Sequence, residues 1–190
     1  MTVFKAEFKP DDLLLVVDVQ KDFCPGGKLA IEGGDEVVPV INSLIKTARD
    51  AGMPVYLSRD WHPKHHISFV ESGGQWPPHC LQDTDGARFH PELEVPHDAV
   101  IVTKGTRFDQ DQNSVFDQTG LADWLHRQKV KRVFIGGLAL DVCVLASVLD
   151  GRKAGFEMYL IEAATRPVNA EDGRAAIEKM RKAGAEILGM

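Results

Sequence analysis

The stretch RVFIGGLALDVCVLAS, residues 132–147, decides the fold class of this protein. It starts as an apolar strand, passes through two glycines and leads into a segment that we expect to be helical over residues 141–154. A strand followed by a helix across a short turn is the repeating unit of α/β folds. The stretch therefore predicts one such unit, with Asp141 and Cys143 where its helix begins.

The same unit recurs along the chain. Helical spacing of apolar residues also predicts helices over residues 37–51, 121–129 and 170–183. Apolar strands are predicted over residues 13–19, 54–58, 99–104, 132–137, 157–164 and 186–188. Strands that are apolar on both faces and alternate with helices are typical of a parallel sheet covered on both sides. We therefore expect a three-layer α/β/α fold.

Composition limits the class of protein and of partner. A chain of 190 residues that is 44% hydrophobic can bury one sizeable core, so we expect a single domain over residues 1–190. A net charge of -6 with scattered Lys and Arg argues against a nucleic-acid partner. The longest apolar runs are far shorter than the roughly 20 residues of a membrane span, and the first residues are charged. We expect a cytoplasmic protein without membrane contact, and the oligomeric state, a homo-oligomer included, stays open.

Reactive residues follow four of the predicted strands. Asp18, Asp60, Lys104 and Cys143 each lie at or beyond the carboxyl end of a strand. In an open parallel sheet, ligands bind beyond these ends. A long segment between the second and third strands, residues 59–98, adds histidines and prolines there, and loops of that length are usually functional. Any one of these residues alone could be a solvated charge or a buried thiol, but together they predict a reactive site.

Cys143 is the candidate nucleophile. If Asp141 caps the helix, Cys143 lies in the first turn, where free N–H groups stabilise a thiolate and can bind an oxyanion. The alternative is a small core residue, because free cysteine is often buried. The strand order places no histidine near Cys143, so the predicted base is Asp18. The three cysteines are widely spaced and form no CxxC pair, which argues against a disulfide framework.

Five stretches together resemble one enzyme family: DVQKDFCPGGKLA, SRDWHPKHHISF, WPPHC, TKG and GGLALDVCV. The chain resembles the nicotinamidase (pyrazinamidase) branch of the isochorismatase-like cysteine hydrolases from about residue 14 to the last helix. The resemblance implies a Rossmann-like fold with a six-stranded parallel sheet. It also implies hydrolysis of nicotinamide, and of pyrazinamide, to the acid and ammonia through a cysteine thioester, in NAD salvage or detoxification. The alternative is another cysteine amidohydrolase of the superfamily, acting on a carbamoyl or other small amide.

The resemblance also assigns the catalytic residues. Asp18, Lys104 and Cys143 match the catalytic triad, in which the aspartate moves the proton and the lysine keeps it ionised. The N–H groups of Ala139 and Cys143 match the oxyanion hole, and the family places a cis peptide bond between Leu138 and Ala139.

A metal site is implied as well. Asp60, His62 and His79 match the ligands of a divalent ion, for which zinc, iron(II) and manganese are all suited. His66 ranks second, because its counterpart is a ligand only in some relatives. We expect ordinary surface or loop roles for the remaining candidates, which are His65, His90, His97 and Cys80.

The substrate pocket is the part where the chain departs from the family. Phe23 and Trp76 match its aromatic walls, and a flat aromatic amide would pack between them. We add Leu138 and Asn113 to the expected substrate-binding residues. Departures from the common pattern occur before the cysteine and at a usual Tyr-Ser pair, where this chain has Leu140, Val142, Asn113 and Ser114. The implied reaction is thus better supported than the ring specificity.

Overall fold

The computed structural model describes residues 7–189, in which six strands form one parallel sheet of order β3-β2-β1-β4-β5-β6. The strands are β1 (Leu13–Val17), β2 (Val55–Asp60), β3 (Val100–Lys104), β4 (Arg132–Leu138), β5 (Glu157–Arg166) and β6 (Glu186–Leu188). The predicted parallel α/β sheet is thereby confirmed.

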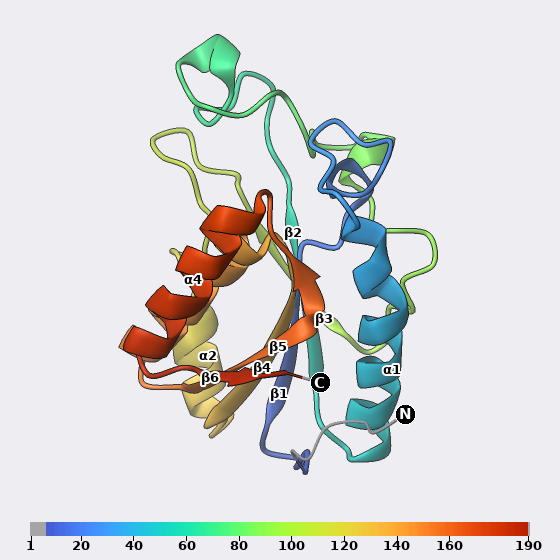
Figure 1. Ribbon diagram of the computed structural model, residues 1–190, viewed down its shortest axis with the longest axis vertical. Coiled ribbons are helices and arrows are strands. Elements are labelled where there is room, and N and C mark those ends of the chain that lie inside the picture. Colours follow the sequence, from blue (N-terminus) through green and yellow to red (C-terminus); the bar gives the residue numbers. More distant parts are fainter. Residues whose placement is uncertain (1–6, 190) are drawn as a thin grey trace.

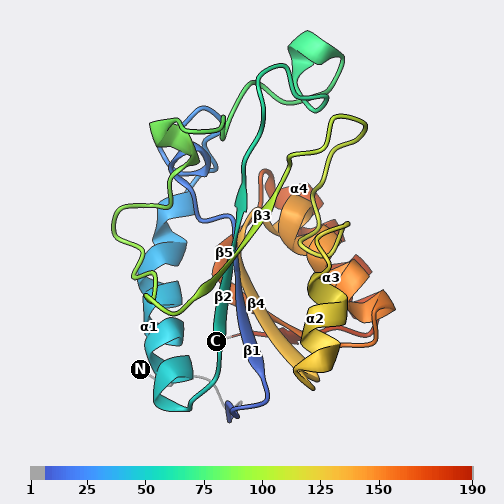
Figure 2. The same cartoon turned by 180° about the vertical axis from the view of Figure 1, so that it is seen from behind.

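Helices cover both faces of the sheet. They are α1 (Val37–Asp50), α2 (Leu121–Arg127), α3 (Leu145–Lys153) and α4 (Ala170–Lys182), with short 3-10 helices at Lys21–Phe23, Gly34–Glu36, Val70–Ser72 and Asp85–Ala87. Helix α1 packs alone on one face, and α2, α3 and α4 lie on the other (Figures 1 and 2). Two apolar cores follow from this arrangement, one on each side of the sheet. None of the helices in residues 7–189 is long and apolar enough to cross a membrane.

The edge strand β3 differs from the expectation of strands buried on both faces. Val100 and Ile101 are 41% and 37% exposed, whereas every residue of β1 is buried. β3 has a neighbour on one side only, and the helices of the outer layer reach it less than they reach the centre. Its apolar composition therefore reflects strand propensity more than burial.

The strand order of the sheet reverses between β1 and β4, and the expected reactive residues lie beyond the carboxyl ends of the strands around this point. β1 ends at Val17, two residues earlier than predicted, because Asp18 has a φ of 49° and turns the chain out of the sheet. Gly137 in β4 approaches β1 so closely that a Cβ there would lie 2.0 Å from the Val17 carbonyl oxygen. With a φ of 117°, only glycine fits this position. The loops after the strands gather above this point (Figure 1).

Candidate active site

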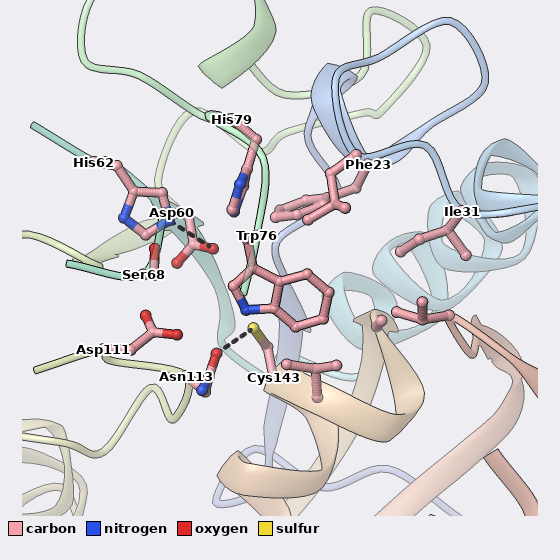
Figure 3. A pocket seen from close by; sticks show the side chains of 14 residues that line it. Phe23, Ile31, Asp60, His62, Ser68, Trp76, His79, Asp111, Asn113 and Cys143 are labelled. Carbon is pink, nitrogen blue, oxygen red and sulfur yellow. Dashed lines mark hydrogen bonds and ion pairs between the residues drawn. The ribbon is translucent and has the colours of Figure 1, made fainter. Parts of the chain in front are cut away.

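A pocket with an open volume of about 390 Å³ lies beyond the carboxyl ends of the central strands. Its lining consists of Phe23, Leu29, Ile31, Asp60, His62, Ser68, Trp76, His79, Asp111, Asn113, Ala139, Val142, Cys143 and Val168. Figure 3 shows the thiol of Cys143 on one side of the pocket and the histidines on another, with the aromatic rings of Phe23 and Trp76 nearby. The predicted reactive residues are therefore brought together.

Lys104 is the centre of the charged group beneath the thiol. Its Nζ lies 2.7 Å from Asp18 Oδ2, 2.6 Å from Asp60 Oδ1 and 3.5 Å from Cys143 Sγ. The side chains of Lys104 and Asp18 are fully buried. Carboxylate and thiol groups of Asp18, Asp60 and Cys143 approach one another closely enough to hold a metal ion, but the ammonium of Lys104 already occupies the space among them.

Ser58 holds the other oxygen of Asp18. Its hydroxyl donates to Asp18 Oδ1 at 2.7 Å, and its backbone carbonyl accepts the Asp18 N–H at 3.2 Å. Ser58 is fully buried in β2, two residues before Asp60 on the same side of the strand. Ser58 was not among the residues expected at the site. The signal that could have found it is this spacing of two from a candidate site residue, on the strand next to β1, which leads into Asp18.

Burial changes the expected ionisation of the thiol. The pKa of Cys143 is raised well above its usual value by burial, while the Lys104 ammonium acts in the opposite direction. Burial thus opposes the expected thiolate, while the nearby positive charge of Lys104 favours it. Burial also raises the pKa of Asp18, against the lowering effect of Lys104. A carboxylate with a raised pKa is a better proton acceptor for a thiol.

The turn that carries Cys143 is a π-helix, Leu140–Val144, and the α-helix α3 begins only after it. Asp141 does not cap this helix, contrary to the expectation. Its carboxylate instead accepts the backbone N–H groups of Val168 and Asn169 at 2.8 and 3.3 Å, and so holds the start of α4 beside the pocket. The Asp141 carboxylate accepts hydrogen bonds from the unpaired N–H groups that lie nearest to it, and here those groups belong to another segment of the chain.

The start of the same turn carries the predicted oxyanion residues. The Leu138–Ala139 peptide bond is cis, as the resemblance implied. Ala139 lines the pocket next to Cys143, and its carbonyl oxygen accepts the N–H groups of Val142 and Val144 at 3.2 and 3.1 Å. These bonds fold the chain back so that Ala139 and Cys143 face the same space.

Asp60, His62 and His79 form a group whose potential ligand atoms lie within 4.8 Å of one another, and all three residues are buried. The Nδ1 atoms of His62 and His79 contact the carbonyl oxygens of Gly105 and Pro77 at 2.8 and 2.7 Å. A carbonyl accepts only from a protonated nitrogen, so each Nε2 is left as a free ligand atom. One carboxylate and two such imidazoles suit a divalent ion, zinc among them.

Two neighbours complete the surroundings of these ligands. Gly105 has a φ of 71°, and a Cβ there would lie 2.6 Å from His62 Cε1, so only glycine leaves room for the ring. The ring of the second-rank candidate His66 lies 4.3 Å from that of His62, centroid to centroid. His66 Nδ1 contacts Ser68 Oγ at 2.8 Å, while its buried Nε2 has no hydrogen-bond partner. His66 is thus adjacent to the metal group but outside its closest set of ligand atoms.

The expected pocket walls are found with one exception. Phe23, Trp76 and Asn113 line the pocket, and Asn113 Oδ1 lies 3.8 Å from Cys143 Sγ (Figure 3). Leu138 does not line it, because its side chain is fully buried in the core on the α1 side of the sheet. Leu138 is the last residue of β4, and Ala139, which follows it across the cis bond, reaches the pocket instead.

The departures from the family pattern also separate into two groups. Val142 and Asn113 line the pocket, whereas Leu140 belongs to the core on the α2–α4 side. Ser114 is buried, and its hydroxyl accepts the N–H of Phe116 at 3.1 Å. The unusual side chains that can contact a ligand are therefore Val142 and Asn113.

The other cysteines are buried and unpaired. Burial raises the pKa of Cys24 to about 11 and raises that of Cys80 well above its usual value. The backbone N–H of Cys80 donates to Asp22 at 2.7 Å, which fixes the loop next to His79. What distinguishes Cys143 from both is its contact with Lys104 and its place on the pocket wall.

Comparisons with known proteins agree with this geometry. The family model described as the isochorismatase domain matches residues 12–190. A nicotinamidase of Escherichia coli (strain K12) is 36% identical over 201 residues, covering 94% of this chain and 94% of that enzyme. A structure of the pyrazinamidase of Pyrococcus horikoshii in complex with zinc has a TM-score of 0.91 and 44% identity, covering 95% of this chain and 100% of that one. PnC1 from L. infantum in complex with nicotinate has a TM-score of 0.90 and 35% identity, covering 98% and 96%. With a family model that spans nearly all its length, and with nicotinamidases and pyrazinamidases among its relatives, this chain belongs to the isochorismatase family.

Proposed function

We propose that this protein is an amidohydrolase that converts nicotinamide, and pyrazinamide, to the corresponding acid and ammonia. The observation that carries the proposal is the meeting of two groups at one pocket. Cys143, backed by Lys104, opens onto the same space as the ligand atoms of His62 and His79. The relatives named nicotinamidase and pyrazinamidase support the same activity.

In the first half of the reaction, Asp18 accepts the proton of the Cys143 thiol. The sulfur then attacks the carboxamide carbon, and the negative charge on the carbonyl oxygen is stabilised by the N–H groups of Ala139 and Cys143. Asp18 returns the proton to the amide nitrogen as the C–N bond breaks. Ammonia leaves, and the acyl group remains on Cys143 as a thioester.

In the second half, a water molecule attacks the thioester carbon while Asp18 accepts one of its protons. The C–S bond breaks, the carboxylic acid forms, and the proton on Asp18 returns to the sulfur. Lys104 stays protonated throughout, because its Nζ lies 2.7 and 2.6 Å from two carboxylates that raise its pKa against the effect of burial. Its charge lowers the pKa of Asp18 against the effect of burial and so favours the ionised carboxylate that acts as the base.

Asp60, His62 and His79 would hold the divalent ion, which is zinc, iron(II) or manganese by the chemistry of its ligands. When bound, the ion supplies a Lewis-acid site for the pyridine nitrogen. Phe23 and Trp76 hold the ring by contact with its faces. In this way the residues of the pocket orient a small aromatic amide so that its carbonyl carbon faces Sγ.

The wider setting is part of the same proposal. Residues 1–190 act as one domain in the cytoplasm on a small molecule and use neither a nucleic acid nor a membrane. The three unpaired thiols and the net charge of -6 support this setting.

A coupled ammonia assay on a panel of amides tests the activity. The panel contains nicotinamide, pyrazinamide, benzamide and a carbamoyl substrate such as ureidoacrylate, each with Zn²⁺, Fe²⁺ or Mn²⁺ supplied. We expect ammonia from nicotinamide and pyrazinamide at the highest kcat/KM. Release from the carbamoyl substrate alone would establish the alternative amidohydrolase activity instead.

A further inference from the structure

Gln20 occupies a gap in the sheet beside the predicted metal ligand Asp60. The last backbone bond between β1 and β2 runs from Asp18 N to Ser58 O, because the chain turns away after Asp18. Two residues farther along β2, the N–H and C=O of Asp60 point to the same side as those of Ser58. No strand residue remains there to pair with them.

The side-chain amide of Gln20 takes the place of the missing strand. Its Oε1 accepts the N–H of Asp60 at 2.8 Å, and its Nε2 donates to the carbonyl oxygen of Asp60 at 2.8 Å. The same Nε2 donates to the carbonyl oxygen of Ala87 at 2.9 Å. The opposite amide orientation would place the nitrogen against the Asp60 N–H and the oxygen against two carbonyl oxygens, so these three bonds determine one orientation.

The backbone of Gln20 is held as firmly as its side chain. Gln20 pairs with Phe89 in an antiparallel bridge, which is flanked by bonds from Lys21 N to Arg88 O and from His90 N to Val19 O, both 2.9 Å. The residue is fully buried. The position of the Gln20 amide is therefore set by its own backbone contacts, and the amide in turn determines where the Asp60 backbone lies.

We propose that Gln20 is a positioning residue for the metal site. It acts through the Asp60 backbone, which sets where the carboxylate lies between Lys104 Nζ at 2.6 Å and His62 Nε2 at 3.5 Å. The inference rests on the proposed function only in taking Asp60 as a metal ligand. Groups that orient a ligand in this way typically contribute 10- to 100-fold to metal affinity.

The test compares Gln20→Met with a matched control, Asn42→Leu. Asn42 also binds a loop backbone through both ends of its amide, at Glu92 O and Glu94 N, but on the outer side of α1. Both substitutions keep the side-chain size and remove only the hydrogen bonds. For each protein we would measure the Zn²⁺ dissociation constant by chelator competition, the visible spectrum of the Co²⁺ form and the Tm of the metal-free form.

We expect Gln20→Met to bind Zn²⁺ at least about 10-fold more weakly and to change the Co²⁺ spectrum, since that spectrum reports ligand geometry. Asn42→Leu should lower Tm without changing either metal measurement. An unchanged affinity and spectrum in Gln20→Met would overturn the proposal, and so would equal weakening in both variants, because lost stability alone would then explain the effect.

A measurement on the unaltered protein covers the case in which Gln20→Met does not fold. Hydrogen exchange at the Asp60 amide of the metal-free protein should be as slow as at amides inside β2. Exchange as fast as in an exposed loop would show that the Gln20 bond is absent in solution and would end the proposal. Since neither experiment uses a substrate, failure of the nicotinamide assay with normal metal binding would be recognised separately.

Discussion

Replacing Lys104 by methionine should cost both stability and activity, and for separable reasons. The ammonium is fully buried, with carboxylate oxygens of Asp18 and Asp60 at 2.7 and 2.6 Å. Each contact corresponds to about 6 kcal/mol of Coulomb attraction at an effective dielectric constant near 20, which offsets the cost of burying three charges. Methionine is an unbranched side chain one heavy atom shorter, so it keeps most of the apolar stem and removes the ammonium with its hydrogen bonds.

The variant leaves two carboxylates close together with no cation between them. Removing one partner of a buried ion pair typically costs about 3–5 kcal/mol, because the remaining charge must stay unpaired or take up a proton. We expect Lys104→Met to lose stability in this range. Adding Asp18→Asn removes one of the two stranded charges, so the double variant should regain part of the loss while remaining inactive without its base.

Denaturant unfolding and ammonia release from nicotinamide, both with metal supplied, measure the two effects. Lys46→Met is the control, because Lys46 pairs with Asp50 at 2.8 Å on the surface and its loss should leave the free energy of unfolding almost unchanged. Each single variant at the catalytic site should lose nearly all kcat/KM, and the double variant little more. Additive losses of stability and of kcat/KM, or a Lys104→Met protein as stable as the control, would refute the reasoning.

Three further outcomes are expected. Cys143→Ala should release no ammonia, while Cys80→Ala stays active, and a folded, metal-loaded but inactive Cys80→Ala protein would contradict the assignment of the nucleophile. Metal removal should lower kcat/KM for nicotinamide by about 10²-fold and should change kcat/KM for benzamide little, because benzamide lacks the ring nitrogen. Equal losses for both amides would rule out a role of the metal in positioning the substrate ring. Ser58→Ala should lower kcat about 10-fold at similar KM, because the Asp18 carboxylate loses one hydrogen bond. Ser58→Thr keeps the hydroxyl and should restore kcat. If threonine does not restore kcat, the loss in Ser58→Ala would be an effect of packing.

The sequence by itself determined the alternation of strands and helices and the rim to which the reactive residues belong. Apolar runs and helical spacing are local properties, so residues 132–147 were enough to indicate a strand, a turn and a helix. The position of a residue at the carboxyl end of a parallel strand is equally local. That is why Asp18, Lys104 and Cys143 could be placed at one edge before any distance was known.

The tertiary structure alone decided which groups satisfy one another. Asp141 looked like a helix cap from its neighbours, yet its carboxylate binds a segment 27 residues away, at Val168. Gln20 pairs with a backbone 40 residues away, and no local pattern encodes such a partner. Burial likewise raises the pKa of Cys143, while Lys104, 39 residues away in the chain, lowers it. Hydrogen-bond partners and desolvation depend on which surfaces meet, and that follows from the packing of the whole chain rather than from any stretch of it.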